Sequence, residues 1–190
     1  MSDRQRLHEL VRPCVKHGRF VLSSGKTSDF YFDAKEVTLT PEGSYLTARL
    51  MLDDFIGPDV TAVGGLTAGA DPIVSAIGVV SHAQGRQPPL KLFYVRKEPK
   101  KHGTAKYVEG PPLAREDRVV IVEDVVTTGK SAREAIERVR SEAGCEIVRV
   151  VALVDRLEGG ARGLEPHELR SIFTREHFPG SAPAGAGPGA

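Results

Sequence analysis

A short, uninterrupted run of aliphatic residues at 119–122 constrains the fold of this chain more than any other feature. The run reads Val-Val-Ile-Val, which is typical of a strand buried on both faces of a parallel sheet. Glu123 and Asp124 follow, then a small hydroxyl-rich loop at 127–131 and an amphipathic helix. Ligands of open α/β sheets bind beyond the carboxyl ends of the strands, and helix N-termini attract phosphate. The segment therefore predicts carboxylates beside a phosphate-binding loop, as a phosphorylated sugar would require.

Two other phosphate-binding loops do not fit this segment. The ending Gly129-Lys130-Ser131 is similar to that of a Walker A loop, but Asp124 stands where that motif needs glycine. The segment also lacks the Gly-x-Gly-x-x-Gly pattern of dinucleotide-binding folds. The simpler alternative is a buried strand followed by a solvated turn. The ordered succession of strand, acids, loop and helix favours a ligand site.

Composition excludes several classes of protein. The 190 residues carry a formal net charge of +1 with well-mixed charges, so we expect no nucleic-acid partner. Cys14 and Cys145 have no metal-ligand spacing, which is typical of a reduced, cytoplasmic protein. No apolar run approaches the roughly 18 residues of a membrane span, and the N-terminus has no signal-peptide pattern, so we expect no membrane association. Residues 179–190 are rich in Gly, Ala and Pro, and we expect a disordered tail there.

Strand and helix patterns alternate along most of the chain. We expect strands at 60–63, 90–95, 119–122 and 147–154, and helices at 72–82 and from Ser131 onward, with Gly144 just past the end of the second helix. This alternation predicts an α/β fold with a doubly wound, mostly parallel sheet. Residues 1–178 would form one domain, to which about 1–40 contribute a small N-terminal cap or hood.

The hood region has a pattern of its own. Helical spacing at 4–17 is interrupted by Pro13, and loose alternation over 19–37 predicts a hairpin. Thr40 with Pro41 predicts the start of a helix that ends before residue 57.

The two adjacent acids suit transfer of a sugar through an oxocarbenium-like state. Neighbouring strand residues point to opposite faces, so Glu123 and Asp124 should not be equivalent, and we expect Asp124 to be the more catalytic. Either carboxylate could be an outer partner of Mg²⁺. In the phosphate loop, Lys130 is either a phosphate contact or a solvated helix residue.

Two further loops should border the site. Residues 96–109 are polar and cationic, and we expect a mobile loop whose Arg96, Lys97, Lys100 and His102 close over an anionic leaving group. Residues 64–71 are glycine-rich and would either cradle pyrophosphate or form a structural turn.

Four motifs in order resemble those of the orotate phosphoribosyltransferase family, which has the type I phosphoribosyltransferase fold. The strand, acids and Thr-Thr-Gly at 119–129 resemble its signature for phosphoribosyl pyrophosphate (PRPP). Residues 20–33 resemble its substrate hairpin, residues 92–103 its catalytic loop, and Asp155-Arg156 its pair near the nucleobase. The resemblance covers about residues 7–157.

The resemblance implies that orotate and PRPP give orotidine 5′-phosphate and pyrophosphate in pyrimidine biosynthesis, with Mg²⁺ held mainly by PRPP and water. It implies catalytic roles for Asp124, Lys100 and His102, and orotate contacts from Tyr31, Phe32, Thr127 and Arg156. It implies PRPP contacts from Arg96, Lys97, Lys100, His102, Glu123, Asp124, Val125, Val126, Thr127, Thr128, Gly129, Lys130 and Ser131. It also implies a homodimer in which the basic loop reaches the neighbouring site.

Two positions depart from the family pattern. Ser23 stands where many members have a lysine in the hairpin, and Ala68-Gly69 stands near another common lysine. Two rival functions are a phosphoribosyltransferase for another nucleobase and a PRPP-sensing regulator without catalysis. The hairpin and Arg156 argue against the first, and the complete basic loop argues against the second.

Overall fold

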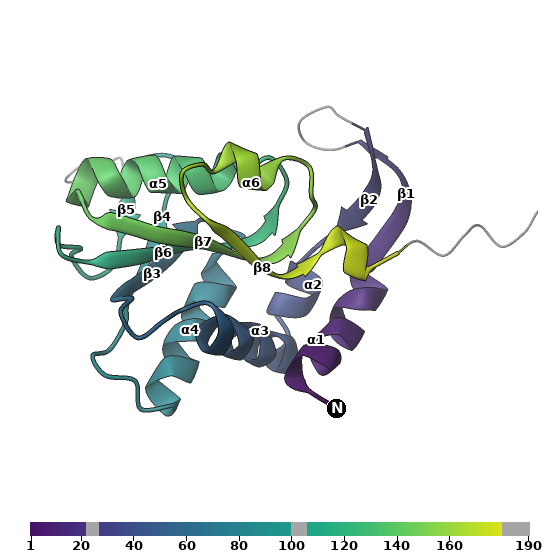
Figure 1. Ribbon diagram of the computed structural model, residues 1–190, viewed down its shortest axis with the longest axis horizontal. Coiled ribbons are helices and arrows are strands. Elements are labelled where there is room, and N and C mark those ends of the chain that lie inside the picture. The colour runs from purple at the N-terminus through teal and green to yellow at the C-terminus, as the bar shows by residue number, and fades with distance from the viewer. Residues whose placement is uncertain (22–26, 100–105, 180–190) are drawn as a thin grey trace, which may run out of the picture.

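A mostly parallel sheet forms the centre of the protein (Figure 1). The computed structural model describes residues 1–21, 27–99 and 106–179. Within these residues, six strands lie in the order β5-β4-β3-β6-β7-β8, and only β5 runs antiparallel to its neighbour. The strands are β3 (Ala62–Leu66), β4 (Lys91–Val95), β5 (Val108–Glu109), β6 (Arg118–Val126), β7 (Glu146–Asp155) and β8 (Leu169–Thr174). The predicted α/β class and mostly parallel sheet are confirmed.

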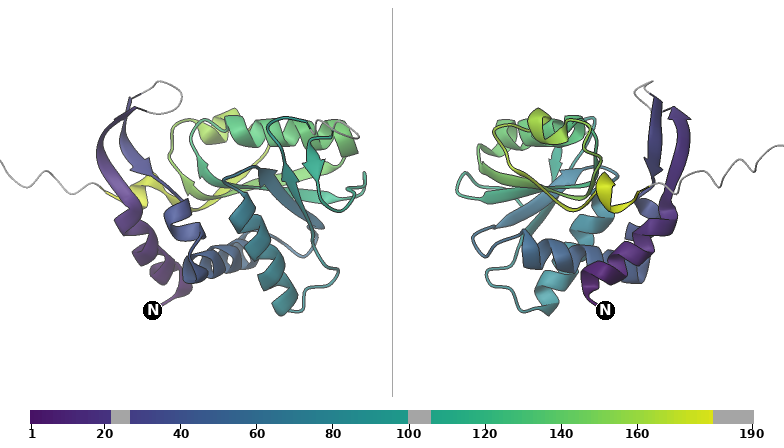
Figure 2. Two further views of the ribbon diagram at one scale, coloured as in Figure 1. Left: turned by 180° about the vertical axis from the view of Figure 1, so that it is seen from behind. Right: turned by 45° about the vertical axis from the view of Figure 1, so that its right-hand side comes forward.

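Helices cover both faces of the sheet, as a doubly wound fold requires (Figures 1 and 2). One face carries α5 (Lys130–Ala143) and the short α6 (Gly160–Gly163). The other carries α1 (Asp3–Val11), α3 (Pro41–Asp54) and α4 (Asp71–Ala83). None of the helices in the described ranges is long and apolar enough to cross a bilayer.

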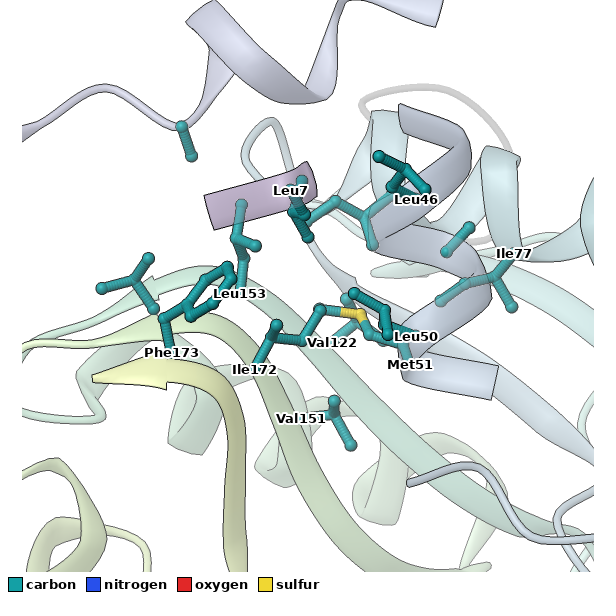
Figure 3. Close-up of a cluster of buried hydrophobic side chains, with 14 of the residues drawn as sticks. Leu7, Leu46, Leu50, Met51, Ile77, Val122, Val151, Leu153, Ile172 and Phe173 are labelled. Carbon is teal, nitrogen blue, oxygen red and sulfur yellow. The ribbon is translucent and has the colours of Figure 1, made fainter. Parts of the chain in front are cut away.

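The aliphatic run of β6 divides its side chains between two hydrophobic cores. Val120 and Val122 pack with α1, α3 and α4, whereas Val119 and Ile121 pack with α5. All four are fully buried, which confirms the prediction of a strand covered on both faces. Figure 3 shows the first core, where Val122 lies among Leu50, Met51 and Val151.

A two-stranded hairpin stands apart from the central sheet (Figures 1 and 2). Strands β1 (Val15–Val21) and β2 (Thr27–Phe32) pair antiparallel, and the short helix α2 (Lys35–Thr38) follows. The C-terminal turn η2 (Arg175–His177) lies beside the base of this hairpin, next to α1. We refer to α1, β1, β2, α2 and η2 together as the hood.

Local signals set several helix ends. The Thr40 hydroxyl accepts the Gly43 N–H at 3.2 Å and Pro41 occupies the first turn, so α3 begins where the sequence predicts. Gly144 adopts a left-handed φ of 64° after α5, which ends that helix as expected. Pro13 lies in the 3₁₀ turn η1 (Arg12–Cys14), so the helical pattern at 4–17 stops at Val11 and β1 begins at Val15.

The ends of β3 and β6 differ from the prediction, and two strands were not predicted at all. Strand β3 begins two residues late and includes Gly64 and Gly65, which we expected in a loop. A side chain at Gly65 would lie 2.2 Å from the Val122 carbonyl oxygen, so these glycines serve close strand packing. Strand β6 extends past its aliphatic run to Val126 and so includes both acids. The short strand β5 and the edge strand β8 were not predicted. The expected tail lies outside the described residues from 180 onward.

Candidate active site

A small cavity brings Glu123 together with the predicted phosphate loop. It has a volume of about 80 Å³ and is lined by Glu123 and residues 125–132. Strand β6 delivers these residues to the carboxyl edge of the sheet, and α5 begins at Lys130. Gly129 has a φ of 76°, a conformation that glycine adopts without strain, and so allows the turn into the helix. The first N–H groups of α5 have no intrahelical partner and are available to a phosphate.

The Glu123 carboxyl is buried and one of its oxygens, Oε1, has no hydrogen-bond partner among the described residues. Burial raises the pKa of Glu123 to about 8, with a further contribution from the charge of Asp124; Lys97 acts in the opposite direction. A buried acceptor without a donor is costly unless a ligand supplies one. Glu123 therefore matches a ligand that brings hydroxyl groups or a cation.

Asp124 lies on the other face of β6. Its Oδ1 accepts the N–H of Val125 at 2.7 Å. Burial raises the pKa of Asp124, while the Val125 hydrogen bond and the charge of Lys35 in α2 lower it. Glu123 and Asp124 thus have different surroundings, in agreement with the prediction that they are not equivalent.

The loop after β3 lies directly against Asp124. A side chain at Gly69 would come within 2.6 Å of the Asp124 carboxylate, so glycine is required for this approach. The N–H of Thr67 bonds to the Val95 carbonyl at 2.9 Å, which ties the loop to the end of β4. The glycine-rich loop, a weak signal in the sequence, therefore borders the same site as the two acids.

Arg156 links the sheet to the hood. Its N–H bonds to the Val126 carbonyl at 2.9 Å, which places it beside the end of β6. Its guanidinium is buried, donates from Nη2 to the Phe30 carbonyl at 2.9 Å and pairs with Glu158 at 2.8 Å. Tyr31 and Phe32 follow Phe30 in β2; Tyr31 is exposed and Phe32 is buried. The predicted orotate residues therefore come from β2 and from the ends of β6 and β7, and Arg156 bonds to the residues before Tyr31 and Thr127.

The cationic loop is only partly described. Arg96 pairs with Glu109 of β5 at 3.0 Å, so its charge is held at the sheet edge and not in the cavity of Glu123. Lys97 is exposed and close enough to influence Glu123 electrostatically. Lys100 and His102, the predicted catalytic members, lie outside the described residues, as does Ser23.

The turn at α6 supports the phosphate loop and was not predicted. A side chain at Gly163 would lie 2.3 Å from the Thr128 carbonyl oxygen, and one at Gly129 would lie 2.9 Å from Leu164. Arg133 of α5 donates to the Gly163 carbonyl at 3.0 Å. The only signal in the sequence is a pair of glycines after Arg156, which carries no specific meaning by itself.

Oxygen ligands for a metal are few. No group of three or more His, Cys, Asp or Glu side chains converges on a metal site in the described ranges. Glu123 and Asp124 offer carboxylate oxygens at one edge, and the former includes the unpartnered Oε1. These residues fit Mg²⁺ as outer partners of a metal held mainly by a ligand and water.

Comparisons with known proteins agree with this geometry. A family model for the phosphoribosyl transferase domain matches residues 61–172. The orotate phosphoribosyltransferase of Nostoc sp. is 48% identical over 173 residues, covering 90% of this chain and 82% of the relative. That of Bradyrhizobium diazoefficiens is 41% identical over 186 residues, covering 93% and 96%.

Solved structures show the same relationship. Mycobacterium tuberculosis orotate phosphoribosyltransferase in complex with PRPP has a TM-score of 0.75 and 38% identity, covering 93% of this chain and 98% of that chain. Leishmania donovani adenine phosphoribosyltransferase has a TM-score of 0.66 at 17% identity, which is a similarity of fold alone. The matched domain carries β6, the phosphate loop and Arg156, and the curated relatives also span the hood. The chain belongs to the orotate phosphoribosyltransferase family.

Proposed function

We propose that the protein transfers the 5-phosphoribosyl group of PRPP to orotate, giving orotidine 5′-phosphate and pyrophosphate. One observation carries this proposal: a buried, unpartnered Glu123 oxygen shares a cavity with the phosphate loop, one strand away from Arg156. The membership of the family supports the choice of orotate.

The phosphate loop would hold the 5-phosphate of PRPP. Free N–H groups at the start of α5 and the hydroxyls of Thr127, Thr128 and Ser131 provide donors on one side of the cavity. Glu123 and Asp124 would accept hydrogen bonds from the ribose hydroxyls. When the bond from the ribose to pyrophosphate breaks, Asp124 would stabilise the positive charge that develops on the sugar.

Orotate would lie between Arg156 and the hood. The buried guanidinium suits a carboxylate because paired, charge-assisted hydrogen bonds are strong. The backbone of Tyr31 and Phe32, with the Thr127 hydroxyl, would complete the contacts. The nucleobase nitrogen then forms its bond to the ribose carbon as the bond from that carbon to pyrophosphate breaks, and the proton that the nitrogen loses passes to the departing pyrophosphate.

Departure of pyrophosphate requires positive charge. Arg96, Lys97, Lys100 and His102 would provide it when the cationic loop closes, and Gly69 and its neighbours would contribute backbone donors near Asp124. Mg²⁺, when bound with PRPP, would neutralise part of the pyrophosphate charge. Glu123 and Asp124 would orient it from the outside.

The active form would be a cytoplasmic homodimer in which the cationic loop serves the neighbouring site. An exposed apolar surface on helix α4 favours a contact with a second copy of the chain. Its Val79 is 71% exposed and lines a groove of about 400 Å³ between α4 and β4. Both described cysteines are free, in keeping with a reduced compartment.

A nucleobase panel tests the proposal. Purified protein would be incubated with PRPP, Mg²⁺ and one of orotate, uracil, adenine or hypoxanthine, and nucleotide formation would be measured. Of the four nucleobases, we expect only orotate to be converted to its nucleotide. Preferred use of another base would contradict the orotate assignment, and PRPP binding without turnover would favour a regulator.

A further inference from the structure

A cavity on the outer side of the hood has no role in the reaction described above. It has a volume of about 510 Å³ and lies between α1, β1 and η2. This is within the roughly 300–1,000 Å³ that small-molecule sites occupy. The view turned by 45° in Figure 2 shows these three elements side by side at the base of the hairpin.

The lining of this cavity is cationic or neutral. It includes Arg12, His8, His17 and His177, and none of the described residues that line it is acidic. Arg12 is exposed and makes no ion pair within the described ranges. A neighbouring hollow shares Arg12, His8 and His177 and also contains Glu9, whose carboxylate pairs with Arg6 at 3.1 Å.

The hydrogen bonds of the imidazoles show which ring atoms already have a partner in the protein. Nδ1 of His177 accepts the Thr174 N–H at 3.0 Å, so the proton of the neutral ring lies on Nε2, which remains a donor. Nε2 of His8 bonds to the His177 carbonyl at 2.9 Å, and the His8 ring stacks on Phe178 with centroids 4.9 Å apart. His8 therefore fixes the turn, while His177, His17 and Arg12 remain for a ligand.

We infer that this cavity binds a compact polyvalent anion of metabolite size, either a polycarboxylate or a phosphorylated compound. The guanidinium of Arg12 and the imidazole donors match oxygen-rich anions. A metal is not the expected occupant, because these imidazoles do not converge as a ligand set in the described part of the chain.

The position of the cavity connects it to the hood. The His17 ring packs edge-on against Phe30 at 5.8 Å, and the Phe30 carbonyl accepts from Arg156 at 2.9 Å. An anion that draws α1, β1 and η2 together would steady the base of the hairpin. This consequence rests on the proposed function, whereas the anion site itself does not.

Ring ¹⁵N signals of the histidines test the site directly. Citrate and, in a separate titration, inorganic phosphate would be added at fixed pH, with sodium chloride matching the ionic strength. We expect saturable shifts of the His17 and His177 signals, with His82 and His167, which lie outside the cavity, as internal controls. Tighter binding of citrate would identify the ligand as a polycarboxylate, and tighter binding of phosphate would identify it as a phosphorylated compound.

An exposed arginine elsewhere provides the matched control. Arg12→Ala should weaken the anion affinity at least about tenfold, which corresponds to about 1.4 kcal/mol. Arg115→Ala, which removes the same charge from an exposed loop position, should leave the affinity unchanged. Absence of saturable shifts with both anions, equal shifts at His82 and His167, or an Arg12→Ala variant that binds as tightly as the parent would overturn the inference.

Discussion

At the scale of single residues, Asp124 carries the strongest catalytic prediction. Asp124→Asn keeps the shape of the side chain but removes its charge, so turnover should fall about 10²-fold or more, or roughly 3 kcal/mol of lost transition-state stabilisation. Glu137→Gln, an exposed substitution on α5 with the same charge change, should leave turnover unchanged. Steady-state rates with circular dichroism as a folding control decide the matter: a folded Asp124→Asn variant with near-normal turnover would exclude the role.

Arg156 should separate the two substrates. Arg156→Ala removes the proposed partner of the orotate carboxylate, so KM for orotate should rise at least about tenfold, since a charged hydrogen bond contributes about 1.5–3 kcal/mol. PRPP affinity, measured by calorimetry, should change by less than about threefold, which is under 0.7 kcal/mol. An equal loss of affinity for both substrates would mean that Arg156 mainly holds the hood through Phe30 and Glu158.

Glu123 predicts a pH dependence of stability. Its pKa in the folded protein is raised to about 8 from an ordinary value of 4.5, so the fold favours the protonated carboxyl. The resulting stabilisation is present below about pH 4.5 and is lost as the pH rises through 8. Glu123→Gln should therefore unfold with a free energy higher than that of the parent by about 1–3 kcal/mol at pH 8, and by much less near pH 5. Urea titrations at both pH values measure this difference, and a difference independent of pH would contradict it.

Binding of PRPP should make Glu123 favour its ionised form over its protonated form. If ribose hydroxyls donate to Oε1, they favour the ionised carboxylate, so PRPP binding near pH 7 should release a proton. Calorimetry in buffers of different ionisation enthalpy measures that release, which Glu123→Gln should abolish. Equal proton release by the parent and the variant would assign it to another group.

At the scale of elements, the α6 turn should control the phosphate loop. In Gly163→Ala the new methyl group would meet the Thr128 carbonyl oxygen at 2.3 Å, so the loop must shift. KM for PRPP should rise at least about fivefold, or about 1 kcal/mol, with a smaller change for orotate. Ala161→Gly, at an exposed position of the same turn, is the control. An unchanged KM for PRPP would show that the turn does not support the loop.

The elements predicted correctly are those with strong local signals. The aliphatic run of β6, the Thr40-Pro41 start of α3 and the Gly144 end of α5 are all determined by neighbours in sequence. Gly64 and Gly65 were misassigned to a loop because glycine indicates a turn locally, whereas here the need is tertiary. A side chain at Gly64 would collide with Phe93 of β4, and one at Gly65 with the Val122 carbonyl oxygen of β6. Strand β8 was missed because its pairing with β7 is set by long-range packing.

The site shows the same division. The acids, phosphate loop and Arg156 follow a motif, and β6 and β7 place them at one sheet edge. The approach of Gly69 to Asp124, the support of Thr128 by Gly163 and the hydrogen bond from Arg156 to the Phe30 carbonyl each join residues from separate elements. Such contacts leave no local pattern in a single sequence.

At the scale of the whole molecule, the proposed shared site predicts recovery of activity by mixing. Homodimers of Lys100→Ala and of Asp124→Asn should each be nearly inactive. If the loop serves the neighbouring subunit, a mixed dimer has one site with both lesions and one intact site, so each heterodimer should approach half of normal activity. Native mass spectrometry would verify the heterodimers. Heterodimers without recovered activity would show that each loop serves its own subunit.

The central claim is that this sheet edge joins orotate to the ribose of PRPP. The most direct measurement follows the loss of orotate absorbance and the release of pyrophosphate in one reaction with PRPP and Mg²⁺. We predict equal molar amounts of orotate consumed and pyrophosphate released, with both rates falling together in Asp124→Asn. Pyrophosphate release without orotate loss, or no loss of orotate by folded protein, would contradict the account.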